Sequence, residues 1–365
     1  MKHSRLLALT VLSSVVSLYV KVPEVRALTI NLTSTDNTQA DIGFRKAADF
    51  WESQFTDDIT VNINAGFEDL GENILGGALS TMAFTNYTSV WNTLLNDITS
   101  PYDTIAVSNL PPIPAFDLLI NRTSDNPNFP PDFETPYLDN DGSENNSIIR
   151  MTTANAKALG FFVPPETFGD FDAEITFSSN FEYDFDNTDG ITLGTFDFEA
   201  IAIHEIGHAL GFISGVDILD INSPPARDTL FPGNAFTFVS PLDLYRYSDE
   251  SFAQGALDWT ADTREKYFSI DGGFTSEGTF STGQFSGDGR QASHWEDNLG
   301  LGILDPTLAR GELGIVTRLD LLAFDVIGWD PVEKPTKDIP EPSPILGMLL
   351  AITGSVLLKT QIKSS

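Results

Sequence analysis

One apolar segment carries His204, Glu205 and His208 at a spacing that places the two histidines on one face of a helix. Residues 198–212 are otherwise almost wholly apolar or small, and they follow Asp197, a favourable helix N-cap. This pattern predicts a buried helix that begins at about residue 198. Positions four apart lie on the same face of a helix, so His204 and His208 point in one direction, with Glu205 beside them.

The pair of histidines and the intervening glutamate fit a metal-dependent hydrolase. Two imidazole nitrogens one helical turn apart can bind zinc at about 2.0–2.1 Å. The chain has no cysteine, so disulfides and thiolate sites are excluded and His, Asp and Glu remain as ligands. Zinc lowers the pKa of its water towards about 7, and Glu205 is placed to take the proton as general base and pass it to a leaving amine.

The longer string from His204 to Phe212 resembles the metzincin clan of zinc peptidases. In that clan a glycine soon after the second histidine lets the chain turn sharply out of the helix, and Gly211 has that place here. Most metzincins then place a third His or an Asp at the position of Ser214. The resemblance implies a zinc endopeptidase whose third ligand comes from elsewhere in the chain.

The sequence leaves more than one candidate for that third ligand. The chain has four histidines, and since His3 lies in an apolar leader, His294 is the remaining imidazole. Asp217 is the rival ligand and Glu296 comes after it, because carboxylates also bind zinc. We prefer His294.

The surroundings of His294 extend the resemblance. Leishmanolysin-like metzincins insert a long segment between the helix and a third histidine that precedes a tryptophan, as His294 precedes Trp295. Their methionine turn follows, and residues 299–306 are similar to it, with Leu304 in the place of methionine. Leucine has a similar volume and can pack beneath a metal in the same way. The chain thus resembles a bacterial, leishmanolysin-like branch of the clan.

The beginning of the chain resembles an export signal. Basic residues near the start precede an apolar run from Leu6 to about Val20, and a small-residue cleavage site follows at Ala27. Residues 1–27 are therefore predicted to be a signal peptide. A membrane anchor or a buried first helix is the alternative, but the run is short for a membrane span.

The end of the chain resembles a second targeting signal. Residues 340–342 read Pro-Glu-Pro, and an apolar stretch over 345–358 precedes Lys359 and Lys363. This arrangement resembles the PEP-CTERM sorting signal of bacteria, which implies an exosortase-like processing enzyme as a partner. It implies transient membrane association through residues 343–365, with an ordinary anchor as the alternative. Either reading places the protein at the cell surface or in the extracellular matrix.

Residues 28–330 are predicted to form one catalytic domain of the α+β class. The chain opens with a strand, an amphipathic helix and a second strand. Thr317 and Asp320 have the spacing of a capping box, which predicts a final helix. Residues 331–342 are rich in proline and charge and are predicted to be a linker.

The metzincin resemblance implies how this domain is divided. It implies two lobes, over about residues 28–211 and 212–330. The first lobe would hold a twisted mixed sheet and the active-site helix. The second would be irregular and end in the final helix.

The charge balance excludes one class of partner and suggests a second metal. The chain has 52 acidic and 20 basic residues, so it lacks the clustered Lys and Arg that nucleic acid binding requires. Asp139 and Asp141 in one loop, and Asp184, Asp186 and Asp189 in another, space their oxygens as calcium loops do. Polar turns on an acidic surface are the alternative.

These observations favour an exported zinc endopeptidase that acts on protein or peptide substrates. The alternatives are a zinc amidase acting on a cell-wall link or another non-peptide amide, and a non-catalytic surface or matrix protein with a structural metal. Glu205 argues against the last, because a structural site needs closed coordination and no base. Tyr245 and Tyr247 are candidates for stabilising an oxyanion, and Asp243 for supporting the site or the fold.

Overall fold

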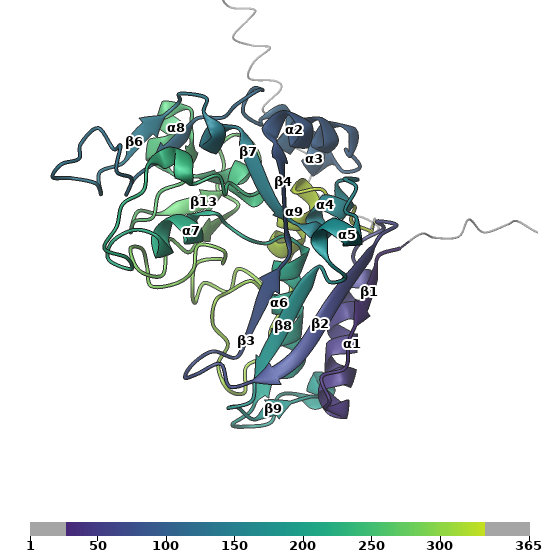
Figure 1. The fold of residues 1–365 in the computed structure, drawn as a ribbon. Coiled ribbons are helices and arrows are strands. Elements are labelled where there is room, and N and C mark those ends of the chain that lie inside the picture. Colours follow the sequence, from purple (N-terminus) through teal and green to yellow (C-terminus); the bar gives the residue numbers. More distant parts are fainter. Residues whose placement is uncertain (1–26, 333–365) are drawn as a thin grey trace, which may run out of the picture.

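The computed structural model describes residues 27–332, which form a mixture of helices and open β-sheets (Figure 1). This confirms the predicted α+β class. Nearly all of the predicted signal peptide, most of the linker and the whole sorting segment lie outside the described residues. Within residues 27–332, no helix is both long and apolar enough to cross a membrane.

A four-stranded mixed sheet organises the first part of the chain. Strands β1 (Thr29–Leu32), β2 (Thr60–Glu68) and β8 (Ala173–Ser178) run parallel, and β3 (Gly76–Ser80) pairs antiparallel with β8 at the edge. Neighbouring parallel strands need a crossover, and α1 (Thr38–Glu52) supplies it between β1 and β2. The predicted strand–helix–strand opening is confirmed.

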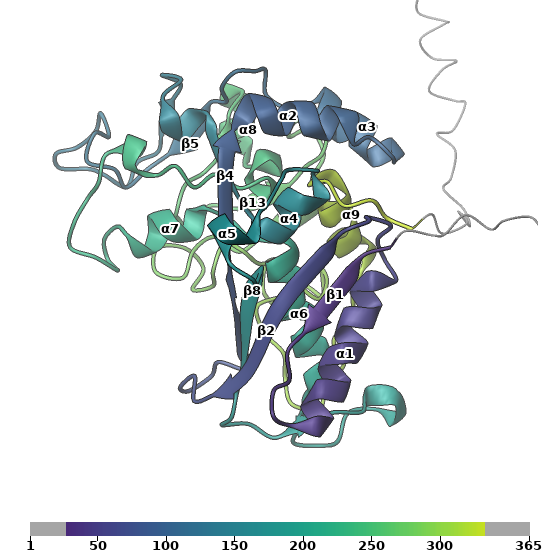
Figure 2. The ribbon, with the colours of Figure 1, turned by 45° about the vertical axis from the view of Figure 1, so that its right-hand side comes forward.

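Helix α6 (Phe198–Leu210) packs beside α1 against one face of this sheet (Figures 1 and 2). The apolar face predicted for α1 is buried, and its Trp51 donates its indole N–H to the backbone oxygen of Ile203 at 3.0 Å. Phe177 of β8 packs on Phe198 at the start of α6, with ring centroids 4.6 Å apart. The helix that carries the predicted metal ligands is thus held by both the sheet and α1.

The remaining strands and helices are short. Strand β4 (Met82–Asn86) pairs antiparallel with β7 (Ile148–Thr152), and two three-stranded sheets have the orders β12-β5-β6 and β11-β13-β14. The other bounds are α2 (Tyr87–Asn96), α3 (Pro101–Ser108), β5 (Leu118–Ile120), β6 (Tyr137–Asp139), η1 (Glu144–Asn146), α4 (Thr153–Ala158), α5 (Pro165–Phe168), β9 (Tyr183–Asp184), η2 (Asn187–Asp189), β10 (Phe196–Asp197), α7 (Val216–Ile221), η3 (Gly233–Ala235), η4 (Leu242–Tyr245), β11 (Arg246–Tyr247), α8 (Asp249–Gln254), β12 (Leu257–Asp258), β13 (Lys266–Phe268) and β14 (Gly278–Phe280).

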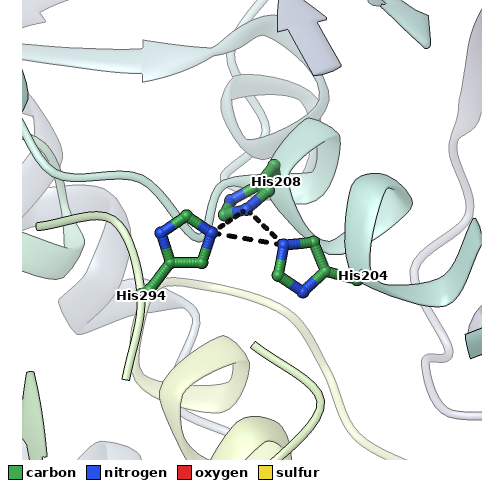
Figure 3. A group of neighbouring side chains, drawn as sticks. All are labelled: His204, His208 and His294. Carbon is green, nitrogen blue, oxygen red and sulfur yellow. Dashed lines mark hydrogen bonds between the residues drawn. The ribbon is translucent and has the colours of Figure 1, made fainter. Parts of the chain in front are cut away.

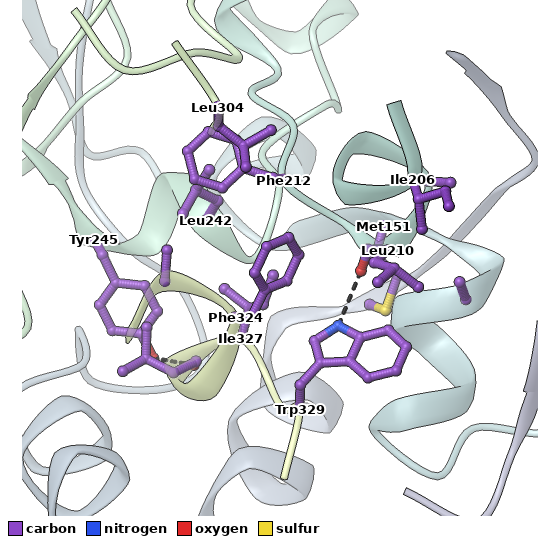
Figure 4. Close-up of a cluster of buried hydrophobic side chains, with 14 of the residues drawn as sticks. Met151, Ile206, Leu210, Phe212, Leu242, Tyr245, Leu304, Phe324, Ile327 and Trp329 are labelled. Atoms are coloured by element: carbon purple, nitrogen blue, oxygen red, sulfur yellow. Dashed lines mark hydrogen bonds between the residues drawn. The ribbon is translucent and has the colours of Figure 1, made fainter. Parts of the chain in front are cut away.

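The predicted final helix is α9 (Arg318–Val326), and its capping box of Thr317 and Asp320 is present. Figure 4 shows the core that α9 shares with the end of α6, in which Phe324 lies close to Phe212. Just beyond α9, Trp329 donates its indole N–H to the backbone oxygen of Leu210 at 2.9 Å (Figure 4). Segments far apart in sequence therefore meet beneath the C-terminal end of α6.

Buried carboxyl groups gather where α9 ends and where α2 is followed by α3. Asp325 accepts a hydrogen bond from the hydroxyl of Ser100 at 2.8 Å, and Asp57 accepts one from the backbone N–H of Asp330 at 3.0 Å. Burial, reinforced by neighbouring carboxylates, raises the pKa of Asp57 to about 7 and those of Asp97 and Asp325 to about 8. The folded protein thus holds protons on these groups at a pH where carboxyls are ordinarily ionised.

We expect the free energy of unfolding to fall as the pH rises from about 4 to about 8, through the contribution of these carboxyls. The unfolded chain releases their protons near the ordinary pKa of 3.8, whereas the folded protein retains them until much higher pH. Urea denaturation of the wild type at about pH 5.5 and pH 8.5 measures this loss. The double variant Asp97→Asn/Asp325→Asn should lose less stability between the two pH values. An equal loss in both proteins would contradict the assignment.

Candidate metal centre

Three imidazole rings meet at one point in the structure (Figure 3). His204 and His208 extend from α6, and His294 comes from the loop after β14; we call these three residues the histidine triad. The Nε2 atoms of His204 and His208 lie 3.0 Å apart, and the Nε2 atom of His294 lies 3.1 Å from that of His208 and 3.2 Å from that of His204. Of the predicted candidates for the third ligand, the structure thus brings His294 to the pair on α6.

The other ring nitrogen of each triad residue contacts a backbone oxygen. The Nδ1 atoms lie 2.8, 2.7 and 3.2 Å from the carbonyl oxygens of Ile303, Phe212 and Gln291, in chain order of the histidines. A carbonyl oxygen only accepts, so each neutral ring carries its proton on Nδ1 and leaves a lone pair on Nε2. All three lone pairs are therefore directed at the same point.

This donor set fits a metal ion. Tetrahedral coordination with nitrogens at about 2.0–2.1 Å places the nitrogens roughly 3.3 Å apart, close to the observed separations. Burial lowers the pKa of His208 to about 3, and it also lowers those of His204 and His294. A metal ligand has to be the neutral imidazole, so burial favours the binding form. The histidine triad can hold one metal ion.

Gly211 ends α6 and shapes the surroundings of the second ligand. Its φ of 123° lies in the region that disfavours side chains, and a methyl group there would come within 3.0 Å of the Cβ atom of Asn155. The reversal brings the carbonyl oxygen of Phe212 back to the ring of His208. The glycine could be predicted from the sharp turn after the helix, but nothing in the sequence indicated that the next residue orients a ligand.

Leu304 packs against α6 at Gly207, which lies between the two helical ligands in the sequence. A methyl group at Gly207 would come within 3.2 Å of its Cδ1 atom. The carboxylate of Asp320 accepts the backbone N–H of Ile303 at 3.0 Å and the indole N–H of Trp295 at 2.8 Å. The helix-capping residue Asp320 thus also fixes the turn that carries Leu304 and the residue after His294, a role that sequence spacing does not indicate.

Asp217, the rival ligand, supports the triad from outside it. Its carboxylate accepts the backbone N–H groups of Ala292 at 2.6 Å and Ser293 at 3.1 Å, as well as the hydroxyl of Ser293. The hydroxyl oxygen of Ser293 also accepts the backbone N–H of Ser214 at 2.8 Å. These bonds join the loop after α6 to the segment that ends at His294, so Asp217 is a positioning residue. Glu296 does not belong to the triad's group of ligand atoms.

Glu205 lies on α6 next to the edge strand β3. Glu205 is 6% exposed, and a methyl group at Gly76 of β3 would come within 3.0 Å of its Oε1 atom. A glycine in this strand therefore leaves the room that the carboxyl group occupies. Burial raises the pKa of Glu205 to about 8.

The two tyrosines proposed as oxyanion stabilisers are buried in the core. Tyr245 is buried and donates its hydroxyl to the backbone oxygen of Val326 at 2.9 Å, and Tyr247 is buried as well. The carboxylate of Asp243 accepts the hydroxyl of Ser214 at 2.6 Å and so holds the start of the loop after α6. Asp243 thus supports the fold near the triad.

The carboxylates predicted to bind calcium lie in two separate loops. Asp139 is half-buried and accepts an amide N–H of Asn145, whereas Asp184 and Asp186 accept backbone N–H groups of their own turn. Throughout residues 27–332, the histidine triad is the one group of three or more His, Asp or Glu ligand atoms that lie within 4.8 Å of one another. Calcium binding by these carboxylates, including Asp141 and Asp189, stays a prediction.

Comparison with known proteins does not add to this geometry. No protein-family model, no curated protein and no solved structure matches the chain.

We expect the change Asp217→Ala to weaken metal binding by about 10–100-fold, as the loss of groups that orient metal ligands commonly does. The variant removes the acceptor that fixes the backbone before His294. Competition with a chromophoric chelator measures the affinity, and circular dichroism verifies folding.

The matched control is Asp189→Ala, an exposed aspartate of η2 outside the histidine triad. This variant should bind the metal of the triad as the wild type does. The metal affinity of Asp217→Asn, which keeps one acceptor oxygen, should lie between those of Asp217→Ala and the wild type. A folded Asp217→Ala variant with wild-type affinity would refute the positioning role.

Proposed function

We propose that this protein is a zinc-dependent endopeptidase that hydrolyses protein or peptide substrates outside the cytoplasm. One observation carries the proposal: a neutral three-imidazole metal site has a buried glutamate as the neighbour of its first ligand. Imidazole ligands suit zinc well. Three protein ligands leave a coordination position open for water or substrate, which is the arrangement of catalytic zinc sites.

The chemistry divides between the metal and Glu205. Zinc held by the triad would supply Lewis-acid activation of a water molecule and of the scissile carbonyl. The carboxylate of Glu205 would accept the proton from the attacking water and deliver it to the leaving amine nitrogen. A general base works best with a pKa near the working pH, and burial shifts Glu205 in that direction.

The same residues argue against a purely structural metal. A structural zinc site is closed by four protein ligands, whereas the triad offers three. Burying the Glu205 carboxyl costs stability, and such perturbed groups are typical of functional sites. A zinc amidase acting on a non-peptide amide would use the same groups and is the second candidate.

The metzincin-like division into two lobes also belongs to this proposal. Its support is that the ligands come from both sides of Gly211, with the main sheet and α6 before it and His294 after it. The two parts are interwoven, because β5 of the earlier part pairs parallel with β12 of the later part. We further propose that the protein is exported, sorted by an exosortase-like enzyme and transiently held at the membrane through residues 343–365.

We predict that Glu205→Gln lowers kcat/KM for peptide cleavage by about 10²–10⁴-fold while the bound zinc is retained, because the amide cannot take the proton. Mass spectrometry of a mixed peptide library incubated with the full-length protein measures cleavage, and elemental analysis measures zinc. The matched control is Glu199→Gln on the same helix, whose side chain is 20% exposed and lies near Lys46. It should cleave as the wild type does.

Other outcomes would decide against the proposal. Unchanged cleavage by Glu205→Gln would exclude this residue as the base. If the zinc-loaded wild type cleaves cell-wall amides but no peptide, the amidase is the correct function. If it holds zinc and hydrolyses neither, the metal is structural.

A further inference from the structure

Two loops far apart in sequence bring several amide oxygens to one hydroxyl group. The hydroxyl oxygen of Ser143 lies 2.8 Å from Oδ1 of Asn145 and 3.5 Å from Oδ1 of Asn146. Oδ1 of Asn234, from η3, contacts the same hydroxyl. We call these four residues the amide cluster.

The orientation of the two buried amides is fixed by Asp139. Asn145 donates its Nδ2–H to the carboxylate of Asp139 at 2.7 Å, and Asn146 donates its Nδ2–H to the backbone oxygen of Asp139 at 3.1 Å. Each amide therefore has its nitrogen on Asp139 and its oxygen towards Ser143. Both asparagines are 0% exposed, so water has little access to those oxygens.

The hydroxyl cannot satisfy the oxygens that face it. Ser143 has one hydroxyl hydrogen, which it can donate to one acceptor at a time. At least one of the buried amide oxygens of Asn145 and Asn146 is then left without a donor, whichever way Asn234 is turned. A buried acceptor without a donor is costly, and native proteins rarely retain one without a further partner. A cation would satisfy all of these oxygens together.

The chemistry of the amide cluster selects a hard cation. Amide and hydroxyl oxygens are ligands of calcium, and oxygens at 2.3–2.6 Å from one calcium ion lie roughly 2.8–3.4 Å from their neighbours. Asp125 lies nearby and accepts the backbone N–H of Gly233, and Asp139 and Asp141 add negative charge. Soft or nitrogen-preferring metals have no suitable donor in this group.

We propose that the amide cluster, Ser143 with Asn145, Asn146 and Asn234, binds one calcium ion. The calcium ion joins η1 to η3 and so fastens residues 139–146 to residues 233–235. The site uses neutral oxygens, and Asp139 acts on it by orienting the two amides. It is separate from the histidine triad and does not rest on the proposed peptidase activity.

Equilibrium dialysis of the metal-depleted full-length protein against radioactive calcium tests the proposal. We expect one calcium per chain, and an increase in melting temperature of about 4 °C at a hundredfold excess over the dissociation constant. Asn234→Ala removes an exposed ligand and should weaken binding at least tenfold without unfolding the protein. Asn140→Ala, an exposed asparagine of the same loop outside the cluster, should bind calcium normally.

Each further outcome has a defined meaning. His294→Ala should lose the triad's metal but keep its calcium, which separates this proposal from the proposed function. No saturable calcium binding up to about 10 mM, far above the range of protein calcium sites, would overturn the proposal. Equal binding by Asn234→Ala and the wild type, or a loss of binding in Asn140→Ala, would overturn the assignment to these residues.

Discussion

The surrounding structure has to hold three nitrogen lone pairs directed at one largely buried point. Neutral rings with Nε2 atoms 3.0–3.2 Å apart repel one another unless a positive ion lies between them. Keeping them there requires that each ring be locked by its Nδ1 contact and that α6 not shift. The mixed sheet, α1 and α4 pack against α6, so the core and the histidine triad form one unit.

Buried and half-buried carboxylates hold the irregular half of the chain together. Asp217, Asp243 and Asp320 each accept several backbone or side-chain hydrogens from loops that have no regular partner. A charged acceptor makes stronger hydrogen bonds than a neutral one, so one side chain can fix a whole turn. Part of the strong acidity of this chain is therefore used inside the fold. In the same way, the carboxylate of Asp139 accepts an amide N–H of Asn145 and so orients part of the amide cluster.

Sequence patterns predicted the elements that are determined by residues close together in the chain. The apolar periodicities of α1 and α6, the caps at Asp197 and Thr317 and the strand–helix–strand opening depend on neighbouring residues. The sequence predicted His294 as the partner of α6 by elimination among four histidines and by a resemblance, since nothing local to His294 indicates its partner. The backbone oxygens that orient the rings and the role of Asp217 in positioning His294 depend on long-range contacts. The amide cluster was missed because asparagines carry no metal signature in sequence.

The central claim is that three histidines bind one metal ion through Nε2. X-ray absorption spectroscopy of the zinc-loaded protein tests it directly, because imidazole gives a characteristic multiple-scattering pattern. The account predicts three imidazole nitrogens at about 2.0–2.1 Å and one further oxygen ligand from water. A zinc shell made of carboxylate oxygens, or one with fewer than three imidazoles, would contradict it.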